Sequence, residues 1–135
     1  MTHLLDTNSV IDHLRREPAS NVTTRLMAAP PGSVALCSVV LAELYYGAMH
    51  SGPAHQAANL ALIAKLRTQF VSLPFDDRAA EEYGKVRAHL AALGTPIGPN
   101  DLMIAAIALA NQLTLVTHNT TEFRRVPGLP LEDWQ

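Results

Sequence analysis

Charge, aromatic residues and cysteine are all scarce in this sequence, and each scarcity excludes a class of protein. Only 16% of the 135 residues are charged and 48% are apolar, which favours a compact domain over a disordered chain. Cys37 is the one cysteine, so no internal disulfide can form, and its apolar flanks predict a buried, inert thiol. With 5% aromatic residues, the core is expected to be built from leucine, alanine, valine and isoleucine.

Long apolar runs and an excess of basic residues are also missing. The chain has no run of 18 apolar residues, and its first residues lead into a predicted strand instead of a signal peptide. We therefore expect a soluble, cytoplasmic protein with no membrane contact. The net charge of −2 provides no general attraction for nucleic acids, although the ten basic residues can still gather on one face.

Apolar segments of strand length alternate with amphipathic segments along the chain, and no Asn-Gly hairpin joins two strands. The predicted strands are Leu4–Leu5, Val34–Cys37, Phe70–Leu73, Leu113–Thr117 and an edge strand near Leu129–Leu131. The predicted helices are Val10–Arg16, Asn21–Ala28, Val39–Met49, Ala54–Arg67, Asp77–Leu93, Pro99–Leu109 and a short Asn119–Arg124. This alternation predicts an α/β fold, a three-layer α/β/α sandwich with a short, mainly parallel central sheet, as a single domain over residues 1–135.

Three acidic residues stand in apolar surroundings, unlike the other nine. Asp6 follows Leu4–Leu5 at a predicted strand end, and Asp101 falls in the first turn of the helix that Pro99 opens. Glu43 lies one turn beyond the capping-box position if Ser38 is the N-cap of its helix, so capping does not explain it. In a parallel sheet, strand carboxyl ends and the helix starts that follow them share one face, so the three carboxylates are expected to meet there.

Carboxylates that converge on one face repel one another unless they are protonated or neutralised by a cation. Oxygen ligands without histidine or cysteine partners suit Mg²⁺ or Mn²⁺. A single acid of this kind is more often a cap or an ion-pair partner, but three in this arrangement favour an acidic metal site. The residues by themselves leave the reaction open.

Four segments in order resemble the signature blocks of PIN-domain nucleases, most closely the VapC toxins of bacterial toxin–antitoxin pairs. They are Leu4–Asn8, Ser38–Gly47, Ile97–Ala106 and Val116–Phe123, and the likeness continues into the closing Leu131–Trp134. Each block alone is weak evidence, but four at this spacing in a chain of this length are specific. The resemblance covers essentially the whole chain.

The resemblance implies an Mg²⁺-dependent endoribonuclease toxin of a VapBC pair, with Mn²⁺ as a possible substitute, RNA as substrate and transfer RNA plausible. Asp6 and Asp101 are then the most direct metal ligands, and Glu43 completes the acidic cluster. Asp6 or Glu43 would orient the attacking water. A cognate VapB antitoxin is the implied partner, and the apolar surplus of the helices between Ser20 and Arg67 favours a homodimer or an antitoxin contact.

The fourth block departs from many PIN domains, because Asn119 stands where an aspartate is common. Asn119 adds no charge, which favours one bound ion over two, although Glu122 is a candidate substitute. Thr7, Asn8 and Thr117 are expected to support the carboxylates by hydrogen bonds or, alternatively, only to cap turns.

Contacts to the substrate are assigned to basic residues near the predicted site. Arg15 and Arg16 follow the first block and Arg124 and Arg125 follow the fourth, so they are candidates for phosphate contacts or, equally, a solvated surface. Tyr45 and Tyr46 could stack on bases, but core packing or a dimer contact is the favoured interpretation. All six histidines are expected to be structural or on the surface, and His118 is the nearest to the site.

Other functions fit the sequence less well. A haloacid-dehalogenase-type phosphatase needs Asp-x-Asp after its first strand, and Asn8 replaces the second acid. That phosphatase and a receiver domain also need a late lysine, but Lys65 and Lys85 lie in helix middles. A non-catalytic PIN-like RNA-binding or scaffold module and a DNA-directed nuclease remain alternatives; retention of the three acids argues against the former and the short chain against the latter.

Overall fold

The computed structural model describes residues 1–135 and contains one sheet of five short strands, all paired in parallel. The strands are β1 (His3–Leu5), β2 (Val34–Cys37), β3 (Val71–Leu73), β4 (Thr114–Val116) and β5 (Leu131–Glu132). Their order across the sheet is β3-β2-β1-β4-β5. The predicted α/β fold with a short parallel sheet is therefore confirmed, including the proline-flanked edge strand.

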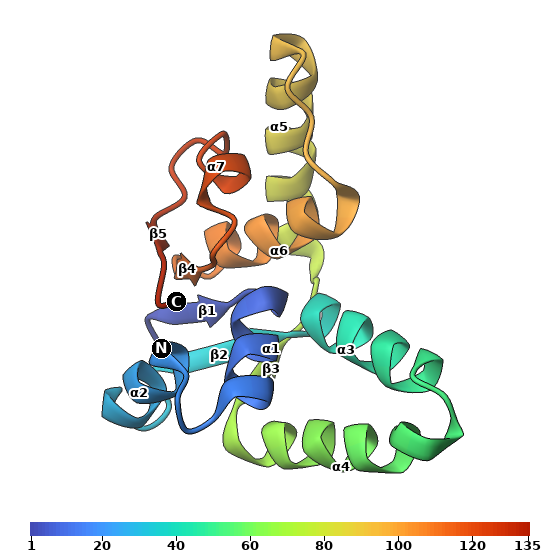
Figure 1. Ribbon diagram of the computed structural model, residues 1–135. Coiled ribbons are helices and arrows are strands. Elements are labelled where there is room, and N and C mark those ends of the chain that lie inside the picture. The colour runs from blue at the N-terminus through green and yellow to red at the C-terminus, as the bar shows by residue number, and fades with distance from the viewer.

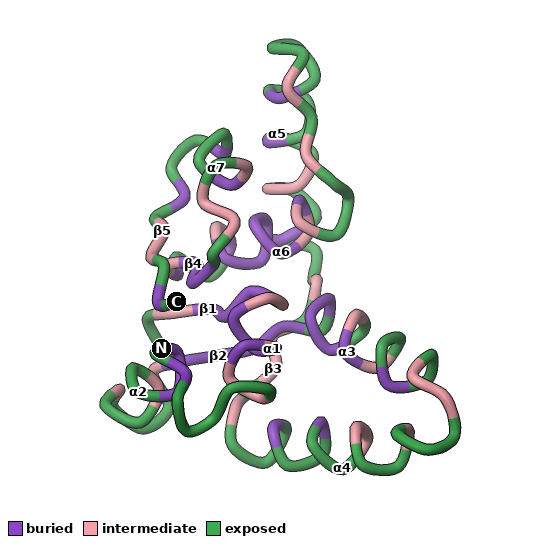
Figure 2. The backbone as a smooth tube through the Cα atoms, in the orientation of Figure 1, coloured by how far each residue is buried: buried purple, intermediate pink, exposed green.

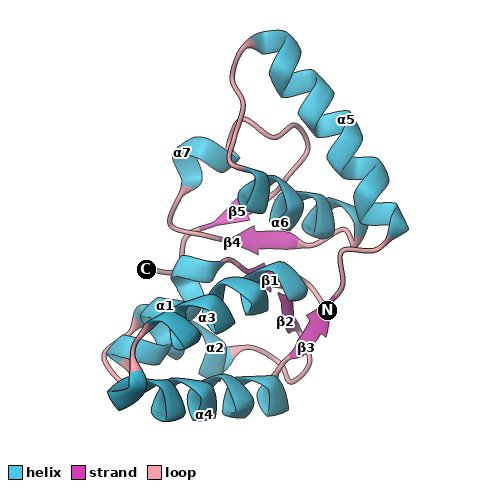
Figure 3. Cartoon of the chain, turned by 90° about the vertical axis from the view of Figure 1, so that its right-hand side faces the viewer, coloured by secondary structure: helices cyan, strands magenta, loops and turns pink.

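Seven helices surround this sheet (Figure 1). They are α1 (Thr7–Arg16), α2 (Asn21–Ala28), α3 (Ser38–His50), α4 (Pro53–Gln69), α5 (Asp77–Leu93), α6 (Pro99–Ala110) and α7 (Thr120–Phe123). The helices α1 to α4 gather around β1, β2 and β3, whereas α5, α6 and α7 gather beside β4 and β5 (Figures 1 and 3). Helix α5 projects as an arm and packs on α6.

The position of the functional edge follows from the strand order. The chain moves outward from β1 to β2 and β3, then returns to the other side of β1 as β4 and β5. Because parallel crossovers are right-handed, the two directions of travel place their helices on opposite faces. The reversal lies between β1 and β4, and open α/β sheets bind ligands at the carboxyl ends of the strands at such a point.

The core is aliphatic, as the composition predicts. Leu4, Leu36 and Leu115 on the three central strands are fully buried, and every residue of β2 is buried. Helix α6 is apolar on nearly all sides and correspondingly buried, whereas α4 and α5 expose most of their surface (Figure 2). None of the helices combines the length and the apolar character needed to cross a membrane.

Local capping signals set most helix ends. The Ser20 hydroxyl accepts from the Thr23 N–H at the start of α2, and the Asp76 carboxylate accepts from the Ala79 N–H at the start of α5. Gly94 ends α5 in the left-handed region with φ of 68°. The prediction that Ser38 caps α3 is wrong, because Cys37 occupies that position without a side-chain hydrogen bond and Ser38 is already helical. Extended backbone continues through the end of β2 and shifts the helix start by one residue.

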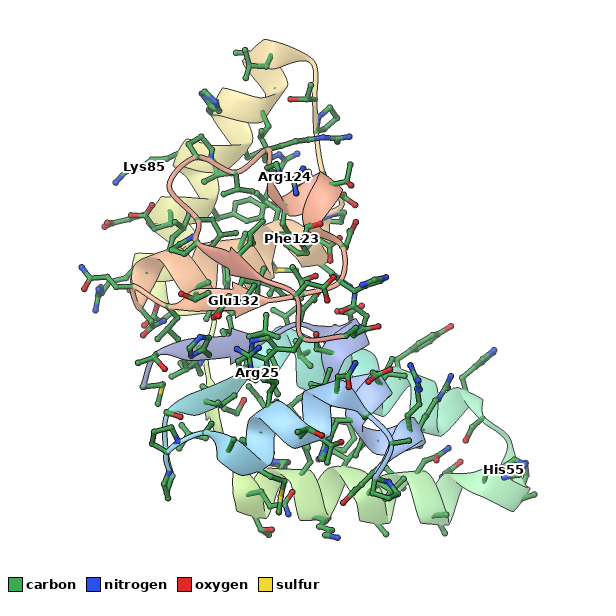
Figure 4. All side chains as sticks on the ribbon, turned by 60° about the vertical axis from the view of Figure 1, so that its left-hand side comes forward. Arg25, His55, Lys85, Phe123, Arg124 and Glu132 are labelled. Carbon is green, nitrogen blue, oxygen red and sulfur yellow. The ribbon has the colours of Figure 1, made fainter.

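Contacts of Glu132 and Trp134 with His3 of β1 and Arg25 of α2 fix the C-terminal residues to the rest of the fold. The Glu132 carboxylate contacts His3 Nε2 and lies 3.7 Å from Arg25 Nη2, which extends from α2 (Figure 4). Trp134 is 5% exposed, with the Arg25 guanidinium carbon 5.0 Å from its ring centroid. These contacts, together with the pairing of β5 with β4, hold the last residues close to the carboxyl end of β4.

Candidate functional site

Asp6 forms the centre of the site. It immediately follows β1 and is the N-cap of α1, with its Oδ1 accepting from the Thr7 N–H at 2.8 Å. Its Oδ2 accepts from the Thr117 hydroxyl at 2.7 Å, so β1 and β4 meet through this carboxylate. Asp6 is only 3% exposed, and this burial raises its pKa, with the charges of Glu43 and Glu122 adding to the effect.

Glu43 reaches the site from the second turn of α3. Its Oε1 accepts a hydrogen bond of 2.7 Å from the Thr7 hydroxyl, which links α3 to the start of α1. This contact accounts for an acid that capping did not explain. Its Oε2 accepts no hydrogen bond within the chain and is free to hold a water or a ligand.

Asp101 lies in the first turn of α6, as the position of Pro99 predicts. Partial burial, together with the charges of Asp6, Glu122 and Glu43, raises its pKa to about 6. Thr7 joins Asp6 to Glu43 by hydrogen bonds to both carboxylates, and the charge effects make Asp101 and Glu122 neighbours of this pair, so the four acids are called the acidic cluster. That Asp6, Glu43 and Asp101 act together as one metal site stays a prediction.

Asn119 and Glu122 form a connected pair in the fourth block. Asn119 Nδ2 donates to Glu122 Oε2 at 2.9 Å, and the Gly98 N–H donates to Glu122 Oε1 at 3.2 Å. Glu122 thus ties the end of β4 to the start of α6, next to Asp101. The sequence predicted a role for Asn119 and Glu122 but not the contact with Gly98, because every residue except proline has a backbone N–H and its donor cannot be recognised from residue type.

Thr117 and Asn8 organise the loop after β4. The Thr117 hydroxyl, besides donating to Asp6, accepts from the Asn119 N–H at 3.0 Å. Asn8 Oδ1 accepts from the His118 N–H at 3.3 Å, and His118 Nδ1 lies 3.0 Å from Asp133 Oδ2. Thr7 and Thr117 hydrogen-bond the carboxylates as expected, whereas Asn8 accepts only from the His118 N–H and the Ser9 hydroxyl and supports no carboxylate directly. The contact of Asp133 with His118 was not anticipated from the sequence.

Whether the residues present fit a divalent cation depends on donor type and on arrangement. Carboxylate and amide oxygens are the donors that Mg²⁺ prefers, and the raised pKa values show negative charge crowded in one place. No three acidic, histidine or cysteine side chains are arranged to hold an ion by themselves. Mg²⁺ usually keeps several waters and takes one or two carboxylates plus substrate phosphates, so the donor chemistry of Asp6 and Asp101 is compatible with such an ion. Direct ligation by Glu43 as a third carboxylate stays a prediction from the sequence.

Two of the four candidate arginines have hydrogen-bond or ion-pair partners within the chain and two do not. Arg16 Nη1 pairs with Asp12 at 3.2 Å, and Arg125 Nη1 donates to the Pro96 carbonyl at 3.3 Å. Arg15 is exposed and lines a groove that Glu43 also lines, and Arg124 is exposed directly after α7 (Figure 4). Arg15 and Arg124 are thus the members of the two pairs with free guanidinium groups.

Cys37 and His13 lie in buried or partly buried positions. Cys37 is fully buried, and that burial raises the pKa of its thiol to about 11, as expected of an inert residue. His13 contacts the Thr23 hydroxyl at 2.7 Å, and burial lowers its pKa.

Known proteins share both the sequence and the fold. The model of the PIN domain family matches residues 3–129. The chain is 41% identical over 131 residues to the tRNA(fMet)-specific endonuclease VapC of Shigella flexneri (97% of this chain, 96% of that protein). It is 37% identical over 134 residues to ribonuclease VapC2 of Rickettsia felis (99% and 98%).

A solved structure extends the likeness to three dimensions. The crystal structure of VapBC2 from Rickettsia felis bound to a promoter DNA fragment superposes with a TM-score of 0.90 at 34% identity and covers the whole of both chains. The match is full length in sequence and in fold, and the acidic cluster lies where the four signature blocks meet. The chain therefore belongs to the PIN-domain family, within its VapC group.

Proposed function

We propose that this chain is the toxin of a VapBC-type pair and hydrolyses phosphodiester bonds of RNA with the help of Mg²⁺, which Mn²⁺ can replace. The acidic cluster of Asp6, Glu43, Asp101 and Glu122 at the β1/β4 reversal is the observation that carries the proposal. The VapC relatives named as ribonucleases and as a tRNA(fMet)-specific endonuclease support the reaction class and make transfer RNA the first substrate to test.

Asp6 and Asp101 would hold the cation, which supplies charge neutralisation at the phosphate and activation of a water at neutral pH. The residues around them keep the ligands in place. The Thr7 N–H and the Thr117 hydroxyl occupy one oxygen each of Asp6, so its orientation is fixed before substrate arrives. Glu122 and Asn119 hold the start of α6 and with it Asp101.

Glu43 is suited to the attacking water. With Oε1 engaged by the Thr7 hydroxyl, its Oε2 can accept a proton from a water as that water attacks phosphorus. The bond from phosphorus to the leaving ribose oxygen breaks, and that oxygen takes a proton from solvent. The products have a terminal phosphate on one fragment and a hydroxyl on the other.

The partner proposal follows from a groove beside the site. A cavity of about 200 Å³ lies between α1, α3 and α4, and its lining includes Ile11, Leu14, Leu62, Arg15 and Glu43. Leu62 is 41% exposed, an apolar side chain that a protein partner would cover. We assign this groove to a VapB antitoxin segment, and Leu62→Asp should abolish co-purification with a co-expressed VapB while the folded chain persists.

Cleavage of a purified transfer RNA pool with Mg²⁺, Mn²⁺ or EDTA tests the activity. The chain should cut with either cation and not with EDTA, and Asp101→Asn should not cut. Asp77→Asn is the matched control, since Asp77 also lies in the first turn of a helix but next to Arg78, which contacts Ala110 at the end of α6 opposite to Asp101. Metal-independent cutting, or full activity of Asp101→Asn, would refute the assignment. A homodimer is expected in light scattering, and a monomer at micromolar concentration would refute that part.

A further inference from the structure

A second cavity opens next to the acidic cluster, between the first three turns of α3 and the first two turns of α6, two helices that contact each other (Figure 1). Its volume is about 420 Å³, within the range of small-ligand pockets. Its lining is Ser38, Val39, Ala42, Glu43, Tyr46, Asn100 and Met103. Glu43 belongs both to this cavity and to the acidic cluster, so a molecule bound here would contact a residue of the cluster.

Tyr46 gives this cavity an aromatic wall. The side chain is 70% exposed, which excludes core packing, one of the two roles that the sequence favoured, and leaves a dimer contact or base stacking. Its ring stacks on His50, one helical turn later, with centroids 5.6 Å apart and planes 9° from parallel. Because one face of the ring lies against His50, the ring is held in place and its other face is available to a ligand.

The remaining lining combines an apolar floor with polar groups that have no partner. Val39, Ala42 and Met103 supply the floor. Ser38 and Asn100 are exposed at the rim, and neither side chain makes a hydrogen bond within the chain. A flat ring with hydrogen-bonding edges matches this combination of stacking surface, apolar floor and free donors and acceptors.

The charge of the cavity lining favours a nucleobase over a phosphate as the part of a nucleic acid that binds there. Phosphate is repelled by the Glu43 carboxylate at the cavity edge, and no arginine or lysine lines the cavity. A nucleobase is uncharged, and its amino hydrogens are attracted to the Asn100 carbonyl and to Glu43. We propose that this cavity is a base-binding subsite, in which an unpaired nucleobase next to the scissile phosphate stacks on Tyr46. This inference rests on the proposed ribonuclease function and adds a subsite to it.

Equilibrium binding tests the subsite without cleavage. A short, fluorescein-labelled single-stranded RNA is titrated in EDTA at low salt, with fluorescence anisotropy as the readout. Tyr46→Ala should weaken binding roughly 5- to 150-fold, the range measured for loss of one stacked base, and Tyr46→Phe should bind like the unchanged chain. Met49→Ala is the matched control, because Met49 is 58% exposed on the same helix but does not line the cavity.

The outcomes separate the subsite from competing explanations. Unchanged binding by Tyr46→Ala, or no binding by the unchanged chain, overturns the subsite. Equal weakening by Tyr46→Ala and Met49→Ala, with loss of dimer in sedimentation, assigns the α3 surface to a second copy of the chain and also overturns it. Tyr46-dependent RNA binding without any metal-dependent cleavage refutes the proposed nuclease and leaves the subsite standing. Cleavage of transfer RNA with an unchanged KM in Tyr46→Ala refutes the subsite alone.

Discussion

Asp101→Asn is expected to stabilise the metal-free chain at neutral pH, although it removes a residue of the proposed catalytic centre. Burial and the neighbouring acids raise the pKa of Asp101 from 3.8 to about 6. The folded state therefore binds the proton more tightly than the unfolded state, and stability falls as pH rises from about 4 to 6 and then stays level. Asparagine has nearly the same shape and carries no charge, so it does not bear this cost.

The magnitude follows from the size of the shift. A shift of about two pKa units corresponds to roughly 3 kcal/mol. Because Asp101 is only half-buried, solvent screening reduces the effect, and we expect about 1–2 kcal/mol in favour of the variant at pH 7.5. For a chain of this length that corresponds to a rise in Tm of roughly 4–8 °C. At pH 4 the two proteins should melt at nearly the same temperature.

Thermal unfolding followed by circular dichroism in EDTA measures the Tm difference between Asp101→Asn and the unchanged chain at pH 4 and at pH 7.5. The control Asp77→Asn should have the opposite sign, a loss of about 0.3–1 kcal/mol, because Asp77 is an exposed acid in the first turn of α5 and interacts favourably with the helix dipole. A lower Tm for Asp101→Asn at pH 7.5 would show that Asp101 makes net favourable contacts and would refute the reasoning. Addition of Mg²⁺ should then raise the Tm of the unchanged chain more than that of the variant.

Three further predictions concern residues around and outside the site. Thr117→Val should cost about 1–3 kcal/mol in urea unfolding, because it removes the hydroxyl that donates to Asp6 and accepts from the Asn119 N–H, whereas Thr117→Ser should retain most of the stability. Cys37 should resist iodoacetamide in the folded chain, because a pKa of about 11 leaves about one thiolate in a thousand at pH 8; rapid labelling before urea is added would contradict its burial. Gly94→Ala should lower the free energy of unfolding in urea by about 1–2 kcal/mol, because Gly94 has a left-handed φ of 68° at the end of α5. Gly84→Ala, inside α5 with open space around it, should raise that free energy by about 0.5–1 kcal/mol, and equal effects of the two substitutions would disprove the conformational argument.

Several features of the fold were open to prediction because they depend on neighbouring residues. The left-handed stop at Gly94, the start of α6 at Pro99 and the cap at Ser20 each require only a residue type beside an apolar periodic segment. The alternation of strands and helices then implied a parallel sheet. Since parallel strands end on one side, the placement of Asp6 and Asp101 as neighbours at that edge could be predicted without knowledge of any contact.

The sequence by itself determined the succession of elements, the apolar core and the acids that share the carboxyl edge of the sheet. Only the tertiary structure decided which side chains meet: Thr7 with Glu43, Glu122 with the Gly98 N–H, and Thr117 with Asp6. It also decided that Tyr46 faces a cavity and not the core. The reason is physical: periodicity and capping act over one or two turns, whereas these contacts depend on how helices distant in sequence are oriented against the sheet.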